Sequence, residues 1–221
     1  MPALKDMNQL AYQFYYERNL PHLQPPGATL FITFRLAESI PVAIQQQLHA
    51  QTDALKTTLS TIGDPDKREE FASQAQRRLF GKWDSVLNMA KFGPTWLREP
   101  QIAKLVSESL HYRDTRVYTL HAFCIMPNHV HIIFTPLRET ENSYYAMAKI
   151  MQSLKGYTAH EANRILGRLG AFWQHESYDH VIRSAAEERR ILQYVLNNPV
   201  KAGLAQDWSE WPWSYCSPEA N

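Results

Sequence analysis

Two histidines separated by one residue are the side chains of this sequence whose types and spacing most clearly suggest chemistry. His129 and His131 follow Pro127-Asn128, a turn pair that lies between two apolar runs. Residues two apart on a β-strand point to the same face, so both imidazoles project together while Val130 points the other way. Two neutral imidazoles on a rigid face can bind a divalent metal, and two ligands favour an open catalytic site over a closed structural one. The competing interpretation is a polar sheet face that merely carries two histidines.

A second group with possible chemistry lies on the last predicted helix. Tyr194 and Asn198 are four residues apart and therefore share a helix face. The amide oxygen of Asn198 could complete a metal site, and oxygen ligands suit Mg²⁺ or Mn²⁺. A phenol is a poor nucleophile when free, but a nearby metal stabilises phenolate and polarises a phosphodiester. Attack would yield a phosphotyrosine and a free hydroxyl, which preserves the energy needed to rejoin the strand. From spacing alone, Tyr194 is better explained as a core aromatic.

Other side chains could contribute to such a site. Tyr157 and Tyr178 are rival nucleophiles, although a packing role is favoured for both. The basic residues that could contact DNA phosphates are Lys149, Lys155, Arg183 and Lys201.

Composition sets limits on the class of protein. The chain has 221 residues and a formal net charge of +1, so no global basic field attracts nucleic acid and any such contact must be local. Its two cysteines do not form a disulfide framework, and Cys124 in an apolar run is expected to be a buried thiol. No secretory signal or membrane-spanning run is evident, so a cytoplasmic protein without membrane contact is expected.

Hydrophobic periodicity predicts alternating strands and helices. Proline and glycine clusters separate the segments, and Ser184 with Glu187 fits a capping box at the last helix. Strands are expected at 28–36, 116–125, 129–135 and 177–183, and helices at 42–60, 67–89, 99–112, 143–166 and 184–197. A βαββαβ order predicts an α+β, ferredoxin-like antiparallel sheet with helices on one face. We expect one domain, 1–221, with an N-terminal arm at 1–25, a helical insertion at 42–95 and a C-terminal helix that carries Tyr194.

These motifs together resemble a known family. Met126-Pro127-Asn128-His129-Val130-His131 resembles the His-hydrophobe-His (HUH) motif of the single-tyrosine, IS200-like transposases. The order of the downstream motifs is similar to that in the REP-associated tyrosine transposase branch. In this chain the motifs are Lys155-Gly156-Tyr157, Phe172-Trp173-Gln174, Tyr178-Asp179 and Tyr194 through Asn198-Pro199 to Leu204.

The resemblance implies a ferredoxin-like HUH endonuclease that acts in DNA transposition. Members of the branch cut and rejoin single-stranded DNA near palindromic hairpins of REP elements, with a divalent metal and a 5′-phosphotyrosine intermediate. By this resemblance His129 and His131 bind the metal, Tyr194 rather than Tyr157 is the nucleophile, and Asn198 lies near the metal. The implied partner is single-stranded or hairpin DNA, bound by a monomer or a homodimer.

Two alternatives to this nuclease remain. One is a domesticated protein of the same ancestry that binds hairpin DNA without cutting it. The other is a metallohydrolase or a zinc-structured module that uses Cys124 with the two histidines. The insertion at 42–95 is longer than a minimal core of the family requires, and a scaffold role is favoured for it over DNA contact or dimerisation. The nuclease hypothesis requires that the Tyr194 phenol lie beside the two imidazoles.

Overall fold

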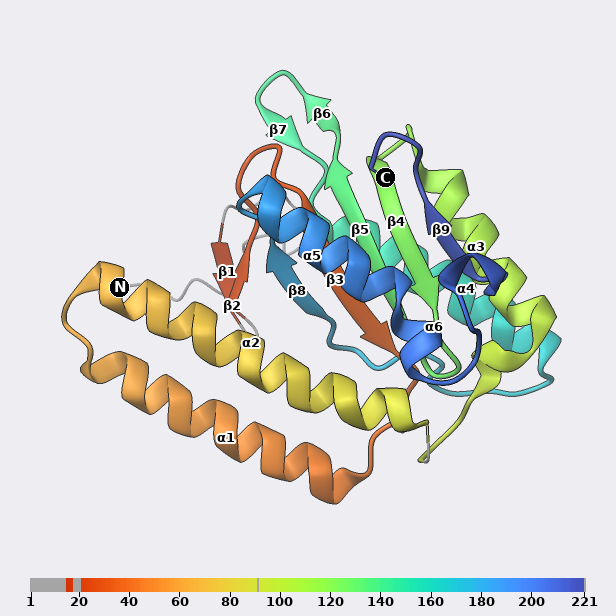
Figure 1. The fold of residues 1–221 in the computed structure, drawn as a ribbon, viewed down its shortest axis with the longest axis horizontal. Coiled ribbons are helices and arrows are strands. Elements are labelled where there is room, and N and C mark those ends of the chain that lie inside the picture. Colours follow the sequence, from red (N-terminus) through yellow and green to blue (C-terminus); the bar gives the residue numbers. More distant parts are fainter. Residues whose placement is uncertain (1–14, 18–20, 91, 221) are drawn as a thin grey trace.

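The computed structural model describes residues 15–17, 21–90 and 92–220, and its centre is a five-stranded antiparallel sheet (Figure 1). The strands are β3 (Leu30–Arg35), β4 (Tyr118–Ile125), β5 (His129–Pro136), β8 (Tyr178–Val181) and β9 (Ser214–Cys216). Their spatial order is β8-β3-β5-β4-β9. Without β9, the four strands follow the order fourth, first, third, second, which is the expected ferredoxin-like arrangement, and the predicted fold class is confirmed.

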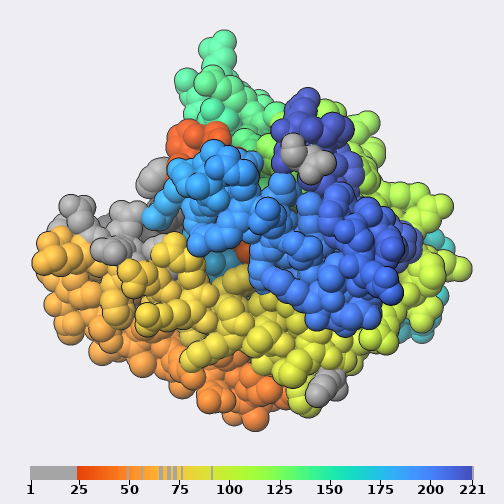
Figure 2. All heavy atoms as spheres, viewed as in Figure 1, coloured from red at the N-terminus to blue at the C-terminus, as the bar shows by residue number. Residues whose placement is uncertain are grey.

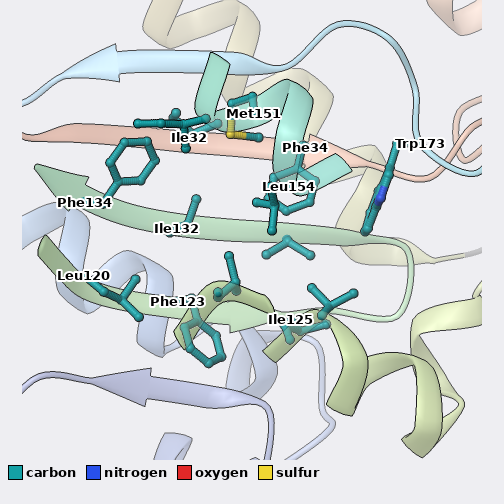
Figure 3. Close-up of a cluster of buried hydrophobic side chains, with 14 of the residues drawn as sticks. Ile32, Phe34, Leu120, Phe123, Ile125, Ile132, Phe134, Met151, Leu154 and Trp173 are labelled. Carbon is teal, nitrogen blue, oxygen red and sulfur yellow. The ribbon is translucent and has the colours of Figure 1, made fainter. Parts of the chain in front are cut away.

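One face of the sheet is covered by α3 (Pro100–Arg113) and α4 (Met147–Ile165). Alternate residues of the strands point to this face and meet apolar residues from the two helices, forming the larger core (Figure 3). Ile32, Ile132 and Leu154 are wholly buried there. The helix pair links the strands as the two crossovers of a split βαβ motif.

The opposite face is covered by α5 (Ala185–Leu196), the short α6 (Asn198–Lys201) and a hairpin of α1 (Val42–Thr61) and α2 (Pro65–Met89). Ile191 and Val195 of α5 pack against Phe31 and Ile133 of the sheet. In Figure 1 the long α1–α2 hairpin lies along the lower left side of the molecule, below β8.

The two ends of this hairpin meet at a close backbone contact. Gly93 has a φ of +67°, and a Cβ there would lie 2.1 Å from the carbonyl oxygen of Glu38. Only glycine fits both the left-handed conformation and this approach. The helical insertion therefore begins and ends at positions that lie next to each other in the structure.

Smaller elements complete the chain. They are β1 (Tyr15–Glu17), β2 (Pro21–Leu23), β6 (Arg138–Thr140), β7 (Ser143–Tyr144) and the 3₁₀ turns Trp96–Arg98 and Trp208–Glu210. Residues 1–14 and 18–20 of the expected N-terminal arm lie outside the described residues. No described helix combines the length and apolarity that a membrane crossing requires.

Two local predictions need correction, and one strand is unexpected. The helix expected at 143–166 begins at Met147, because Ser143 pairs with Thr140 in a β6–β7 hairpin. The C-terminal tail contributes the unexpected strand β9, which adds to the edge of β4. At α5, Ser184 Oγ accepts the Glu187 amide at 3.2 Å as expected, but the Glu187 carboxylate accepts the Arg183 amide at 3.0 Å instead of that of Ser184.

Candidate metal and nucleophile site

The histidine pair lies on a central strand and is wholly buried. In the register of β3 and β5, His131 is opposite Thr33 and His129 is opposite Arg35, so all four side chains belong to the α5 side of the sheet. Both imidazoles are 0% exposed. Their Nε2 atoms are 3.0 Å apart, which shows that the two rings converge as the sequence predicts.

Hydrogen bonds to the other ring nitrogens orient the pair. His129 Nδ1 lies 2.7 Å from Asn128 Oδ1, and Asn128 Nδ2 donates to the carbonyl oxygen of Leu87 at 3.1 Å, which turns the amide oxygen toward the ring. His131 Nδ1 lies 2.7 Å from Thr33 Oγ1. The Asn128 oxygen is an acceptor, so it holds the ring proton of His129 at Nδ1 and leaves the Nε2 lone pair of that ring facing inward, as metal-binding histidines require.

The inserted helix α2 contributes a third candidate ligand, Asp84. Its Oδ1 is 3.3 Å from His131 Nε2, and ligand atoms of the three residues lie within 4.8 Å of one another. Sequence reasoning missed Asp84, because the mixed charges of this segment indicated a solvated helix. A signal was present: Asp84 is four residues after Phe80 and three before Leu87, so a carboxylate lies on the apolar stripe of the helix.

Electrostatics favour a negative carboxylate at Asp84 beside a neutral His129 ring. Burial and the nearby His131 lower the pKa of His129 to about 3. Burial alone would raise the pKa of Asp84, but the contact with His131 and the positive charge that either histidine carries when protonated outweigh this and lower it to about 2. At neutral pH the cluster thus presents the Asp84 carboxylate and the neutral imidazole of His129 to one point.

Tyr194 reaches this cluster within the same chain. Its hydroxyl donates a hydrogen bond to Asp84 Oδ2, and its ring centroid is 5.7 Å from that of His131. Burial, followed by the charge of Asp84, raises the pKa of the Tyr194 phenol well above its usual value. The juxtaposition that the nuclease hypothesis requires is present, and no second copy is needed to provide it.

Buried oxygen atoms around the cluster lack donors. Asn198 is 0% exposed, and its Nδ2 donates to the Tyr194 carbonyl at 3.0 Å. Among the described residues, the oxygen atoms Asn198 Oδ1, Asp84 Oδ1 and Asn88 Oδ1 have no hydrogen-bond partner. Asn88 Nδ2 donates to Asp84 Oδ2 at 2.7 Å, so it belongs to the same network. Buried acceptors without donors are costly, and a bound cation would satisfy them.

The donor set fits a divalent cation. Two nitrogens bound at about 2.1 Å with a right angle between the bonds lie about 3.0 Å apart, and the two Nε2 atoms are 3.0 Å apart. Cys124 is not part of this Asp84–His129–His131 group. Burial raises the pKa of its thiol to about 12, and the thiol contacts Met126 and Ser214, so Cys124 is a packed core residue as expected.

The predicted basic residues are divided between the two faces. Lys201 is exposed and its ammonium lies 4.8 Å from the centroid of the Tyr194 ring, so it borders the site. Arg183 precedes the N-terminus of α5. Lys149 pairs with Glu139, and Lys155 donates to the carbonyl oxygens of residues 174 and 175 at 2.7 and 2.8 Å.

The rival nucleophiles are separated in the same way. Lys149, Lys155 and the half-exposed Tyr157 all belong to α4, on the side of the sheet away from the histidines. Tyr178 lies on the histidine side but stacks on Phe80 at a centroid distance of 4.1 Å. Of the three tyrosines, Tyr194 is therefore the one that contacts the Asp84–His129–His131 cluster.

Comparison with known proteins finds similar proteins of one kind. The family model for IS200-like transposases matches residues 98–198, which include both histidines, Tyr194 and Asn198 but not Asp84. A candidate REP-associated tyrosine transposase of Haemophilus influenzae is 30% identical over 99 residues, covering 42% of this chain and 56% of that protein. The chain thus spans little more than half of that relative's length. The REP-associated tyrosine transposase of Escherichia coli is 28% identical over 134 residues, covering 61% of this chain and 75% of that protein.

A solved structure of a REP-associated tyrosine transposase bound to a REP hairpin is also similar, with a TM-score of 0.48 and 18% identity over 90% of this chain and 80% of that chain. The resemblance to the REP-associated branch of IS200-like transposases is confirmed by the family model and the two sequence relatives.

Proposed function

We propose that this protein, whose residues 98–198 match the IS200-like transposases, is a metal-dependent single-stranded DNA endonuclease and strand transferase. It acts near palindromic hairpin DNA and forms a 5′-phosphotyrosine intermediate. The observation that carries this proposal is the hydrogen bond from the Tyr194 hydroxyl to Asp84, whose other carboxylate oxygen faces the His131 Nε2 atom. The candidate nucleophile and the candidate metal ligands therefore meet at the carboxylate of Asp84.

Tyr194 supplies the attacking oxygen. Its phenol proton, donated to Asp84 Oδ2 in the structure, is lost as the bond from Oη to phosphorus forms. The bond from phosphorus to the 3′ oxygen of the upstream strand breaks, and that oxygen takes up a proton. The reverse reaction, with another 3′ hydroxyl as the attacking group, rejoins the strand and requires no nucleotide cofactor.

Asp84, His129 and His131 would hold the divalent cation, with Asn198 as a further oxygen ligand. When bound, the cation acts as a Lewis acid that offsets charge on the phosphate under attack. Carboxylate and amide oxygens suit Mg²⁺ or Mn²⁺, and the two imidazoles favour Mn²⁺ of the two. Asn128 and Thr33 orient the rings and act as positioning residues.

Access to the site is expected along α5 and α6. The histidines are wholly buried, but Tyr194 is partly exposed and Lys201 is exposed beside it. Figure 2 shows a narrow hollow between the blue atoms of α5 and the yellow atoms of α2. A phosphodiester approaching from this side would meet the Lys201 ammonium, which is a point charge suited to phosphate.

Adduct formation tests the proposal. Single strands that carry a hairpin stem with randomised flanks and a 3′ label are incubated with the protein and Mn²⁺, and covalent complexes are separated on a denaturing gel. We expect a labelled adduct with the wild type, its loss in Tyr194→Phe with hairpin binding retained, and its persistence in the matched control Tyr157→Phe. An adduct that survives Tyr194→Phe contradicts the assignment of the nucleophile.

The same experiment identifies the alternative function. If the wild type shifts hairpin DNA in a native gel but forms no adduct and no cleaved product with Mg²⁺ or Mn²⁺, the protein is a hairpin-binding protein without nuclease activity. Such a result would contradict our proposal while leaving the family assignment unaffected.

A further inference from the structure

A cavity lies beside the candidate site, between the α1–α2 hairpin and the sheet. Its volume is about 130 Å³ and it is partly open to solvent. The cavity walls come from α1, α2, β3 and the segment that enters β8, and the residues used below are Thr33, Arg35, Thr52, Phe80, Trp83 and Tyr178. The helical insertion, for which a scaffold role was favoured, thus forms much of this cavity.

The cavity and the histidine pair share a wall. Thr33 lines the cavity, and its hydroxyl lies 2.7 Å from His131 Nδ1. Arg35, two residues along the same strand and on the same face, is opposite His129. On α2, Trp83 lines the cavity and the next residue, Asp84, faces the histidines. A group in the cavity is therefore one side chain away from the site of the proposed reaction.

A buried guanidinium lines the cavity without a carboxylate partner. Arg35 is 8% exposed, and its Nη1 donates to Ser39 Oγ at 3.2 Å and to the Leu36 carbonyl at 3.5 Å. Among the described residues no carboxylate forms an ion pair with it, and burial lowers its pKa to about 10. Buried charges are usually paired, so an oxygen atom from a ligand would relieve the cost of this one.

Aromatic rings form the remaining walls. Phe80 and Tyr178 stack with centroids 4.1 Å apart, and the Arg35 guanidinium lies 5.4 Å from the centre of the Trp83 ring. Proteins that bind single strands combine aromatic faces, on which bases stack, with basic groups that follow the backbone. A phosphate alone would contact the guanidinium but would make no use of the aromatic walls.

We propose that this cavity receives one unstacked pyrimidine base of the DNA strand, next to the phosphodiester positioned at Tyr194. This inference rests on the proposed function. A cavity of about 150 Å³ holds one benzene ring, so a cavity of about 130 Å³ suits a single six-membered ring better than a purine. Pyrimidines carry a ring carbonyl that can accept a hydrogen bond from Arg35, and adenine carries none.

Filling the cavity tests the proposal. Fluorescence anisotropy measures the binding of short homopolymers of thymidylate, cytidylate and adenylate in the presence of EDTA, so that no cleavage is required. We expect the wild type to prefer the pyrimidine strands, and Thr52→Trp to weaken their binding by at least about fivefold. Thr57→Trp, the same change at an exposed position of the same helix, should leave the preference intact.

If circular dichroism shows that Thr52→Trp does not fold, a second pair of variants tests the same proposal. Trp83→Ala removes an aromatic wall and should reduce the pyrimidine preference by a similar factor. Its control is Tyr112→Ala, which removes an aromatic side chain that is 64% exposed on α3.

The outcomes separate this proposal from the nuclease proposal. Equal binding of all three homopolymers by the wild type, or an unchanged preference in folded Thr52→Trp and Trp83→Ala, overturns the pyrimidine pocket even if the adduct with Tyr194 forms. A pyrimidine preference that is lost in both variants supports the pocket, and it does so even if no adduct is found.

Discussion

The two faces of the sheet bury different chemistry. On the α3–α4 side the buried polar groups are few and well bonded: Arg113 donates to Ser109 and Ser153, and the Trp173 indole donates to Thr158 at 2.8 Å. On the α2–α5 side a carboxylate, two imidazoles and an amide are buried together, with several oxygen atoms lacking donors. The comparison indicates that one face supplies stability and the other carries a site at some cost to stability.

The largest effect is expected on the apolar side. Leu154→Ala should reduce the free energy of unfolding by about 2–5 kcal/mol, because Leu154 is wholly buried on α4. The matched control, Leu169→Ala at a 93% exposed position, should change it by less than about 0.5 kcal/mol. Urea denaturation measures both. If the two variants lose equal stability, this face is not the main source of stability.

An intermediate effect is expected on the polar side, from metal binding. At a free Mn²⁺ concentration of about 100 times Kd, the wild type should gain about 2.7 kcal/mol in unfolding free energy, and a chelator should remove this gain. In Asp84→Asn, Mn²⁺ affinity should fall at least about tenfold, because the cluster loses its only charged ligand.

Asp53→Asn, at an exposed position of α1, is the control and should retain the affinity of the wild type. Calorimetric titration with Mn²⁺ provides the measurement. Wild-type affinity in Asp84→Asn would mean that the carboxylate is not a ligand, and the polar face would then lack its third donor.

The smallest effect concerns how α5 is fixed on the polar side. Burial would raise the pKa of Glu187, but the Arg183 amide and His180 bind its carboxylate and lower it below its ordinary value near 4.5. A lowered pKa in the folded state gives stability that is present above the ordinary value and is lost as the pH falls through the folded value. The contribution should be below about 1 kcal/mol.

Thermal unfolding between neutral pH and the acid side of 4.5 tests this. Glu187→Gln should show a shallower loss of stability on acidification than the wild type. Glu108→Gln, which removes an exposed ion pair with Lys104, should follow the wild-type curve. Identical slopes for the wild type and Glu187→Gln would contradict the assigned role of this carboxylate.

Local patterns were sufficient for most of the fold and for half of the site. Runs of β-branched and aromatic residues located β3 and β5, and the two-residue period of a strand placed His129 and His131 on one face. The spacing of Tyr194 and Asn198 placed both on one side of the last helical segment, although Asn198 begins a new short helix there. These features depend on residues that are close in sequence.

The missing half depends on contacts between distant segments. Asp84 is 45 or more positions before the histidines, and nothing local indicates that α2 would lie against β5. Likewise, the tail at Ser214–Cys216 acquires its strand conformation by pairing with β4. Tertiary packing decided both outcomes, and sequence periodicity carries little information about it.

The close approach of Gly93 to Glu38 has an evolutionary consequence. Because both stems of the helical hairpin leave the domain at the same place, gaining or losing the hairpin is a single local event that leaves the rest of the chain's path unchanged. That one event adds or removes Asp84 together with Trp83. Descendants that differ only in this appendage are therefore expected to differ in both the proposed cation site and the proposed base pocket.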